Sequence, residues 1–108
     1  MPKAELTYAS AGVSFDANEA AMTSIKSTIE STYRPEVLSH VGSFGGLFQL
    51  GDYSQPVLVS STDSVGTKLK LAFMTGRYDT TGFDLVSLCG NDIVVQGAEP
   101  RFFLDYNG

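Results

Sequence analysis

The sequence predicts a small two-layer domain of the α+β class, a two-layer α/β sandwich. Apolar residues recur at helical spacing in three segments, namely 16–33, 65–75 and 82–96. Short runs rich in β-branched and aromatic residues have the length of strands, and these are 47–50, 56–61 and 101–106. Short helices interleaved with strands pack as two layers around one core.

The composition is that of a globular domain with no basic surface for nucleic acid. The formal net charge is −5, so a phosphate ligand would need local cations, either lysine side chains or Mg²⁺. The single cysteine, Cys89, cannot form an internal disulfide and lies among apolar residues, where we expect it in the core. The apolar runs are too short to span a membrane. These features indicate a cytoplasmic protein that binds neither nucleic acid nor membrane.

The N-terminal third predicts a mobile segment followed by one amphipathic helix. Residues 1–15 are mostly polar and begin without a pattern, so we expect them to be mobile. Asp16 and Glu19 have the spacing of a capping box with Asp at the cap, and apolar residues follow at helical spacing as far as 33. Pro35 then prevents the helix from continuing.

Residues 42–68 contain a glycine loop, a predicted hairpin and a predicted strand-to-helix turn. Strands 47–50 and 56–61 are expected to pair through residues 51–55. Asp63 follows the second strand at once, and a helix begins near Val65 and ends at Gly76. Such a turn directs backbone N–H groups at a phosphate, whereas the alternative is that Asp63 only caps the helix and Lys68 is solvated.

The third helix is expected to carry Asp92 on its apolar side and to end at Gly97. Leu85, Leu88 and Asp92 fall on one helical face, where an unpaired carboxylate is costly. Either Asp92 is a buried acceptor satisfied by neighbouring donors, or it faces a cation or a cation-bound phosphate. Pro100 prevents the helix from resuming.

Three blocks resemble one family of ATP-binding proteins. Asp92-x4-Gly97-Ala98-x-Pro100 matches the D-x4-G-A-x-P signature of the superfamily that includes aminoimidazole ribonucleotide (AIR) synthetase. Residues 61–69 resemble the T-D-G-V-G-T-K-L block of the AIR synthetase family, and residues 11–13 resemble its N-terminal A-G-V. The blocks occur in the family order and span nearly the whole chain. The sequence departs from the family at Ser64, where glycine is usual, and at Ser10 and Ser14, where aspartate is usual.

The resemblance implies a more specific fold and assembly. In that family a mixed sheet is covered by helices on one face, and its other face packs against a second subunit to form a dimeric β-barrel. The nucleotide lies near the subunit interface. Family members are much longer than this chain, so residues 16–108 are expected to be part of an N-terminal ATP-binding domain. Alone, the chain is expected to be a catalytically inactive homodimer.

The resemblance also implies an activity and a set of ligands. The family closes formylglycinamidine ribonucleotide to AIR with ATP and Mg²⁺, releasing ADP and phosphate, in purine biosynthesis. By resemblance, Asp63 and Asp92 hold Mg²⁺. The residues assigned to the ATP phosphates are Gly45, Gly46, Ser64, Gly66, Thr67 and Lys68. Further candidates are Asp84, read as a helix-start or loop-anchoring residue, Asn91 and Asp105. No side chain is an obvious general base.

Two alternatives remain at this point. Selenophosphate synthetase and thiamin-phosphate kinase share the Asp92-type motif. Against selenophosphate synthetase, the glycine loop 42–46 carries no Asp-Asp pair and no reactive cysteine precedes it. A different class is a non-catalytic module that dimerises or binds nucleotide. Nucleotide titration separates binding from assembly alone.

Overall fold

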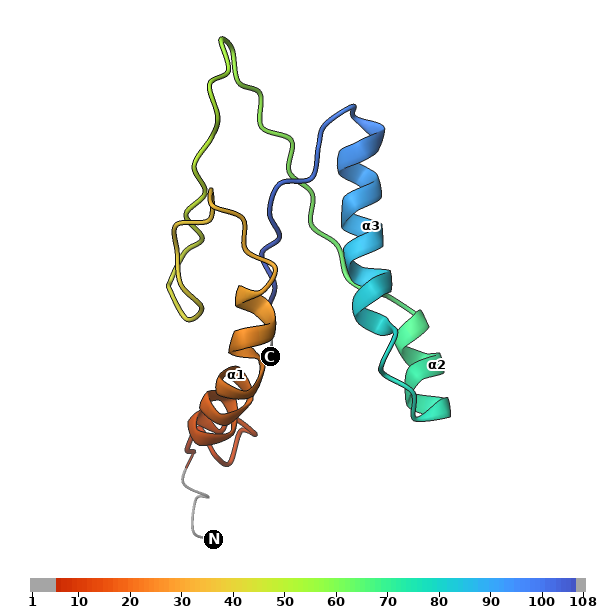
Figure 1. Ribbon diagram of the computed structural model, residues 1–108. Coiled ribbons are helices and arrows are strands. Elements are labelled where there is room, and N and C mark those ends of the chain that lie inside the picture. The colour runs from red at the N-terminus through yellow and green to blue at the C-terminus, as the bar shows by residue number, and fades with distance from the viewer. Residues whose placement is uncertain (1–5, 107–108) are drawn as a thin grey trace, which may run out of the picture. The chain divides into compact units, whose positions relative to one another are not determined.

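The computed structural model describes residues 6–106, which contain three α-helices (Figure 1). They are α1 (Phe15–Glu30), α2 (Lys68–Thr75) and α3 (Thr81–Val95), in the three segments where helical spacing occurs. The chain divides into two compact units, Met1–Leu50 and Gly51–Gly108. Within residues 6–106 no helix is both long and apolar enough to cross a membrane.

In the first unit, hydroxyl side chains form hydrogen bonds with the backbone at both ends of α1. The N-cap is Ser14, whose Oγ accepts a hydrogen bond from the backbone N–H of Ala17 at 3.2 Å. The prediction that Asp16 caps the helix is therefore wrong, and Asp16 lies in the first turn, where the helix dipole favours a carboxylate. The helix ends three residues earlier than predicted because the hydroxyls of Ser31 and Thr32 donate to carbonyls of its last turn.

The residues before α1 form a hydrogen-bonded turn. The backbone N–H of Thr7 donates to Ser10 Oγ at 2.9 Å, and the backbone N–H of Ser10 donates to Thr7 Oγ1 at 3.1 Å. The rings of Tyr8 and Phe15 meet edge to face with centroids 5.4 Å apart. The mobility expected of residues 1–15 stays a prediction, and residues 1–5 lie outside the described part.

Residues 47–49 pair with 36–38, which is a different partner from the one predicted. Val37 and Phe48 form an isolated antiparallel bridge, flanked by Leu38 N–H to Leu47 O and Gln49 N–H to Glu36 O, both 2.8 Å. The predicted pairing of 47–50 with 56–61 joins the two compact units and stays a prediction. A turn with Gly42 at φ +92° and a hydrogen bond from Leu47 N–H to Ser39 Oγ support the observed connection.

In the second unit, α2 and α3 pack beside one another and their ends are set by glycines (Figure 1). Gly76 and Gly97 have left-handed backbones at φ +67° and +78°, and they end α2 and α3 as predicted. Helix α2 begins at Lys68 instead of Val65 because Gly66, at φ +72°, interrupts the helical backbone. Among the described residues, the buried apolar side chains are Ala72 and Cys89, which confirms the core position of the cysteine.

The predicted strands 56–61 and 101–106 form no ladder within residues 6–106. They carry large apolar side chains that are exposed in this chain, namely Val57, Leu58, Val59, Phe102, Phe103 and Leu104. A strand needs a neighbour for its backbone N–H and C=O groups, whereas a helix bonds internally. The described part contains the helices of the expected α+β domain, and its mixed sheet and dimeric barrel stay predictions.

Candidate nucleotide and metal site

Helix α3 positions Asp92 beside, and not within, its inward face. The less exposed residues of α3 include Leu85, Leu88, Cys89 and Ile93, the stripe that the spacing predicts. Asp92 is exposed, so the alternative in which it is a buried acceptor is wrong, and the alternative in which it faces a cation stays a prediction. Its Oδ2 accepts a hydrogen bond from Ser61 Oγ at 2.8 Å. The carboxylate therefore lies at the edge of the helix, where it is open to solvent and to a ligand.

The Ser61–Asp92 hydrogen bond joins two of the three sequence blocks. Its partners are 31 positions apart, one at the start of the segment 61–69 and the other at the start of the D-x4-G-A-x-P motif. Sequence reasoning missed Ser61 as a site residue. Its place at the head of the block was the available signal, but the contact with α3 is tertiary and no spacing rule reveals it.

Asp63 stabilises the turn before α2 and does not cap the helix. Its Oδ1 accepts a hydrogen bond from the backbone N–H of Ser64 at 2.7 Å. The N-cap of α2 is Thr67, which makes no side-chain capping bond. The capping alternative for Asp63 is thus wrong, and one oxygen of each predicted metal ligand, Asp63 and Asp92, already accepts a hydrogen bond.

Gly66 supplies the left-handed backbone in this turn, and Ser64 does not. Every described residue with a positive φ is a glycine, so Ser64 adopts its conformation without the strain of a left-handed side chain. A Cβ on Gly66 would meet no atom within 4 Å. Glycine is therefore favoured at position 66 by backbone conformation and not by lack of space.

Lys68 is paired with Asp84 at the start of the two helices. Its Nζ lies 3.0 Å from Asp84 Oδ1, which connects the first residue of α2 to the first turn of α3. Lys68 is an exposed surface lysine, as its alternative expected, but it is also paired, and Asp84 occupies the predicted helix start. Both side chains are partly exposed, and such surface pairs contribute only about 0.2–1 kcal/mol. A phosphate can therefore compete for Lys68 at small cost.

The remaining predicted residues are exposed. Asn91 precedes Asp92 on α3, and Asp105 lies in the segment after Pro100. Gly45 and Gly46 belong to the first unit, in the loop after Gly42. Their assignment to the nucleotide stays a prediction.

Arg101 makes a second long-range contact that sequence reasoning missed. Its Nη2 donates to Tyr53 Oη at 2.8 Å and lies 2.8 Å from Glu99 Oε2. The guanidinium thereby attaches the segment after Pro100 to the loop 51–55. Like the Ser61 contact, this one joins positions too far apart for any local pattern to predict.

The carboxylates fit a cation delivered with a nucleotide better than a resident metal centre. Among the described residues, no three His, Cys, Asp or Glu side chains are grouped as a metal site. Mg²⁺ is commonly held by one or two carboxylates together with waters and substrate phosphates. Asp63 and Asp92, each with one oxygen outside the hydrogen bonds described above, suit that mode.

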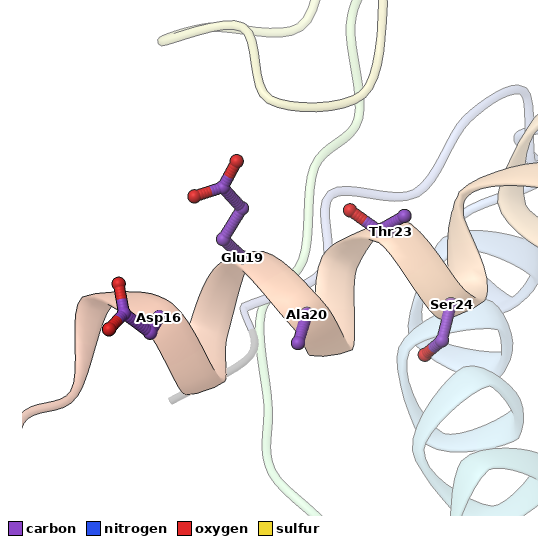
Figure 2. Close-up of a pocket in the computed structure, with 5 residues that line it drawn as sticks. All are labelled: Asp16, Glu19, Ala20, Thr23 and Ser24. Carbon is purple, nitrogen blue, oxygen red and sulfur yellow. The ribbon is translucent and has the colours of Figure 1, made fainter.

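A hollow along α1 has a lining that does not suit a phosphate. Figure 2 shows its lining side chains, which all come from this one helix and are Asp16, Glu19, Ala20, Thr23 and Ser24. They follow one another at helical spacing along a single surface. Two carboxylates without a lysine or arginine repel a phosphate, and none of the predicted site residues lines the hollow.

Comparison with known proteins agrees with the three sequence blocks. The family described as "AIR synthase related protein, N-terminal domain" matches residues 46–108. A relative from Geotalea daltonii is 59% identical over 98% of this chain and 31% of its own length, and one from Citrifermentans bemidjiense is 58% identical over the same shares. A third, from Magnetococcus marinus, is 59% identical over 94% of this chain and 29% of its own length. All three are named phosphoribosylformylglycinamidine cyclo-ligase.

The chain spans about a third of the length of these relatives. The family match includes the turn before α2, all of α2 and α3, and the D-x4-G-A-x-P motif. The resemblance that the sequence blocks indicate is therefore confirmed: the chain belongs to the AIR synthase family and corresponds to the N-terminal part of its members.

Proposed function

We propose that this chain is the nucleotide-binding N-terminal part of a phosphoribosylformylglycinamidine cyclo-ligase. The observation that carries the proposal is the Ser61–Asp92 hydrogen bond, because it brings two family blocks together at the edge of α3. The names of the relatives support the same reaction class. They also favour this enzyme over selenophosphate synthetase and thiamin-phosphate kinase.

The proposed reaction is the ATP-dependent closure of formylglycinamidine ribonucleotide to AIR. The amide oxygen of the substrate is a poor leaving group. Transfer of the γ-phosphoryl group to that oxygen releases ADP and gives an iminophosphate. The neighbouring amidine nitrogen then attacks the activated carbon, the C–O bond breaks, and phosphate and a proton leave. The protein must hold the phosphates in line and neutralise the charge that develops on them.

The residues of the second unit suit the first of these steps. Lys68 supplies a point charge for the phosphates when it leaves Asp84 and binds them instead. The turn containing Gly66 and Thr67 precedes α2, where the helix dipole favours an anion, although the N–H groups of Leu69 and Lys70 already donate to the carbonyls of this turn. Asp63 and Asp92 would hold Mg²⁺. When bound, that ion neutralises charge on the phosphate oxygens.

We further propose that the strand-like segments complete the sheet of a dimeric barrel. Segments 56–61 and 101–106 expose apolar side chains that a neighbouring layer or subunit would cover. In this assembly the proposed nucleotide site would be part of a larger protein, which the reaction requires. The core of the described residues is small, since its buried apolar side chains are Ala72 and Cys89, and a chain with so small a core needs a partner to bury more apolar surface. This favours one second candidate, a module that dimerises or binds nucleotide without catalysis.

A chimera tests the proposed function. The chain replaces the matching third of the Geotalea daltonii relative, and AIR formation is measured with ATP, Mg²⁺ and formylglycinamidine ribonucleotide. The unmodified relative is the positive control, and the 108-residue chain alone is expected to be inactive. Turnover by the chimera supports the cyclo-ligase. A folded chimera that binds Mg·ATP without turnover would favour the non-catalytic module instead.

A further inference from the structure

We propose that Ser61 is a positioning residue for Asp92: its hydroxyl holds Oδ2 so that Oδ1 is presented to the divalent cation that accompanies the nucleotide. The inference rests on the proposed function and adds a residue to it. It is carried by a single well-formed contact, 2.8 Å between Ser61 Oγ and Asp92 Oδ2. That length is typical of an O–H···O hydrogen bond, and the ionised acceptor strengthens it.

The two oxygens of the Asp92 carboxylate have different roles: Oδ2 accepts the hydrogen bond, and Oδ1 is left for the cation. A serine hydroxyl has one proton to donate, and here that proton is directed at Oδ2. A carboxylate offers lone pairs on both oxygens, so Oδ1 keeps its capacity to bind a cation. None of the ion pairs described between residues 6 and 106 involves Asp92. Lys68, the lysine of the block 61–69, is paired with Asp84.

Exposure makes this bond more important for orientation than for folding. Both Ser61 and Asp92 are exposed, and without the bond the Asp92 side chain would sample several rotamers in water. Holding one rotamer removes that entropic cost from cation binding. Ser61 is also two residues before Asp63, so the same contact ties the segment that carries the second predicted ligand to α3.

The test uses the chimera and compares Ser61→Ala with Ser61→Thr. Binding of a non-hydrolysable ATP analogue is measured by calorimetry over a series of Mg²⁺ concentrations, and thermal unfolding is measured without ligand. Ser61→Ala is expected to raise the Mg²⁺ concentration at half-maximal binding by about 2- to 10-fold, the value of one net hydrogen bond. Ser61→Thr keeps a hydroxyl and is expected to restore most of the affinity.

Ser60→Ala is the matched control, because Ser60 is the adjacent exposed serine and is not among the residues assigned to the site. It is expected to leave the Mg²⁺ dependence unchanged. An unchanged Mg²⁺ dependence in Ser61→Ala would overturn the positioning role alone. A lowered unfolding temperature with no selective effect of Mg²⁺ would also overturn it, since Ser61 would then be structural. Failure of the unsubstituted chimera to bind Mg·ATP would overturn the proposed function and this inference with it.

Discussion

The second unit contains two kinds of region that share one chain but differ in what completes them. Helices α2 and α3 make their own backbone hydrogen bonds, and they hold Lys68, Asp84 and Asp92 in defined contacts. Segments 56–61 and 101–106 have strand-like sequences but no ladder within the described residues, and their apolar side chains are exposed. A helix can form from local interactions, whereas a sheet requires a neighbour. Lys68 and Asp84 are held by helix-to-helix contact alone, whereas Asp92 also depends on Ser61 at the end of segment 56–61.

The largest expected effect is a loss of turnover on substitution of Asp92, which lies on helix α3. Asp92→Asn in the chimera keeps the shape of the side chain and removes its charge. We expect turnover to fall by about 100-fold or more, which corresponds to roughly 2.7 kcal/mol in the activation free energy. The unfolding temperature should change little because the residue is exposed. A destabilised protein with unchanged Mg·ATP affinity would show that Asp92 is a structural acceptor.

The next largest effect is expected on self-association through the strand-like segments 56–61 and 101–106. The 108-residue chain is expected to self-associate, and Leu58→Lys should weaken that association by about tenfold or more, because a buried leucine contributes roughly 1.5–3 kcal/mol. Analytical ultracentrifugation at roughly tens of micromolar gives the mass distribution. Ser54→Lys, which adds the same charge in the adjoining exposed loop, is the control. A clean monomer before any substitution would contradict the prediction.

A smaller effect is expected at the turn before α2. Gly66→Ala forces a side chain into a left-handed backbone, which costs about 1–2 kcal/mol of folding free energy. Gly82→Ala is the matched control, since Gly82 lies in α3 without a positive φ or a close neighbour, and alanine there should stabilise by up to about 1 kcal/mol. Denaturant unfolding of the chimera measures both. Equal effects of the two substitutions would argue against the turn geometry.

The smallest effect is expected for the Lys68–Asp84 pair. Asp84→Asn should lower the free energy of unfolding by about 0.2–1 kcal/mol, and the difference should shrink at high salt. Because Asp84 competes for Lys68, the same change should tighten binding of the ATP analogue slightly. Unfolding and titration at two ionic strengths separate the two effects. Weaker binding would mean that Asp84 assists the phosphate instead of competing with it.

The sequence predicts the helical elements well because their signals are local. The end of α3 agrees within one residue, and Gly76 and Gly97 adopt the left-handed backbones expected of helix stops. The cap of α1 is Ser14 and not the predicted Asp16, which lies two positions later, because a local pattern does not show where the first turn begins. Strand partners were not predictable, since the pairing of 36–38 with 47–49 depends on closing a loop.

The site could be predicted as residue types but not as contacts. The block 61–69 and the motif that begins at Asp92 are visible in the sequence, and so is the lysine that a phosphate site needs. That Ser61 reaches Asp92, and that Lys68 pairs with Asp84, depends on how the segment before α2 lies against α3. The exposure of Asp92 was missed for the same reason: helical spacing gives a direction, but the surrounding layers decide how deep a residue lies.

The most direct test is a crystal structure of the chimera with Mn²⁺ and a non-hydrolysable ATP analogue. Manganese replaces magnesium at oxygen sites and gives an anomalous signal that locates it without reference to the protein atoms. We predict an anomalous peak within bonding distance of Asp92 Oδ1, with the Ser61 hydroxyl still on Oδ2 and the analogue's phosphates beside the turn at Gly66. A peak away from both Asp63 and Asp92, with the analogue bound elsewhere, would contradict the proposed site.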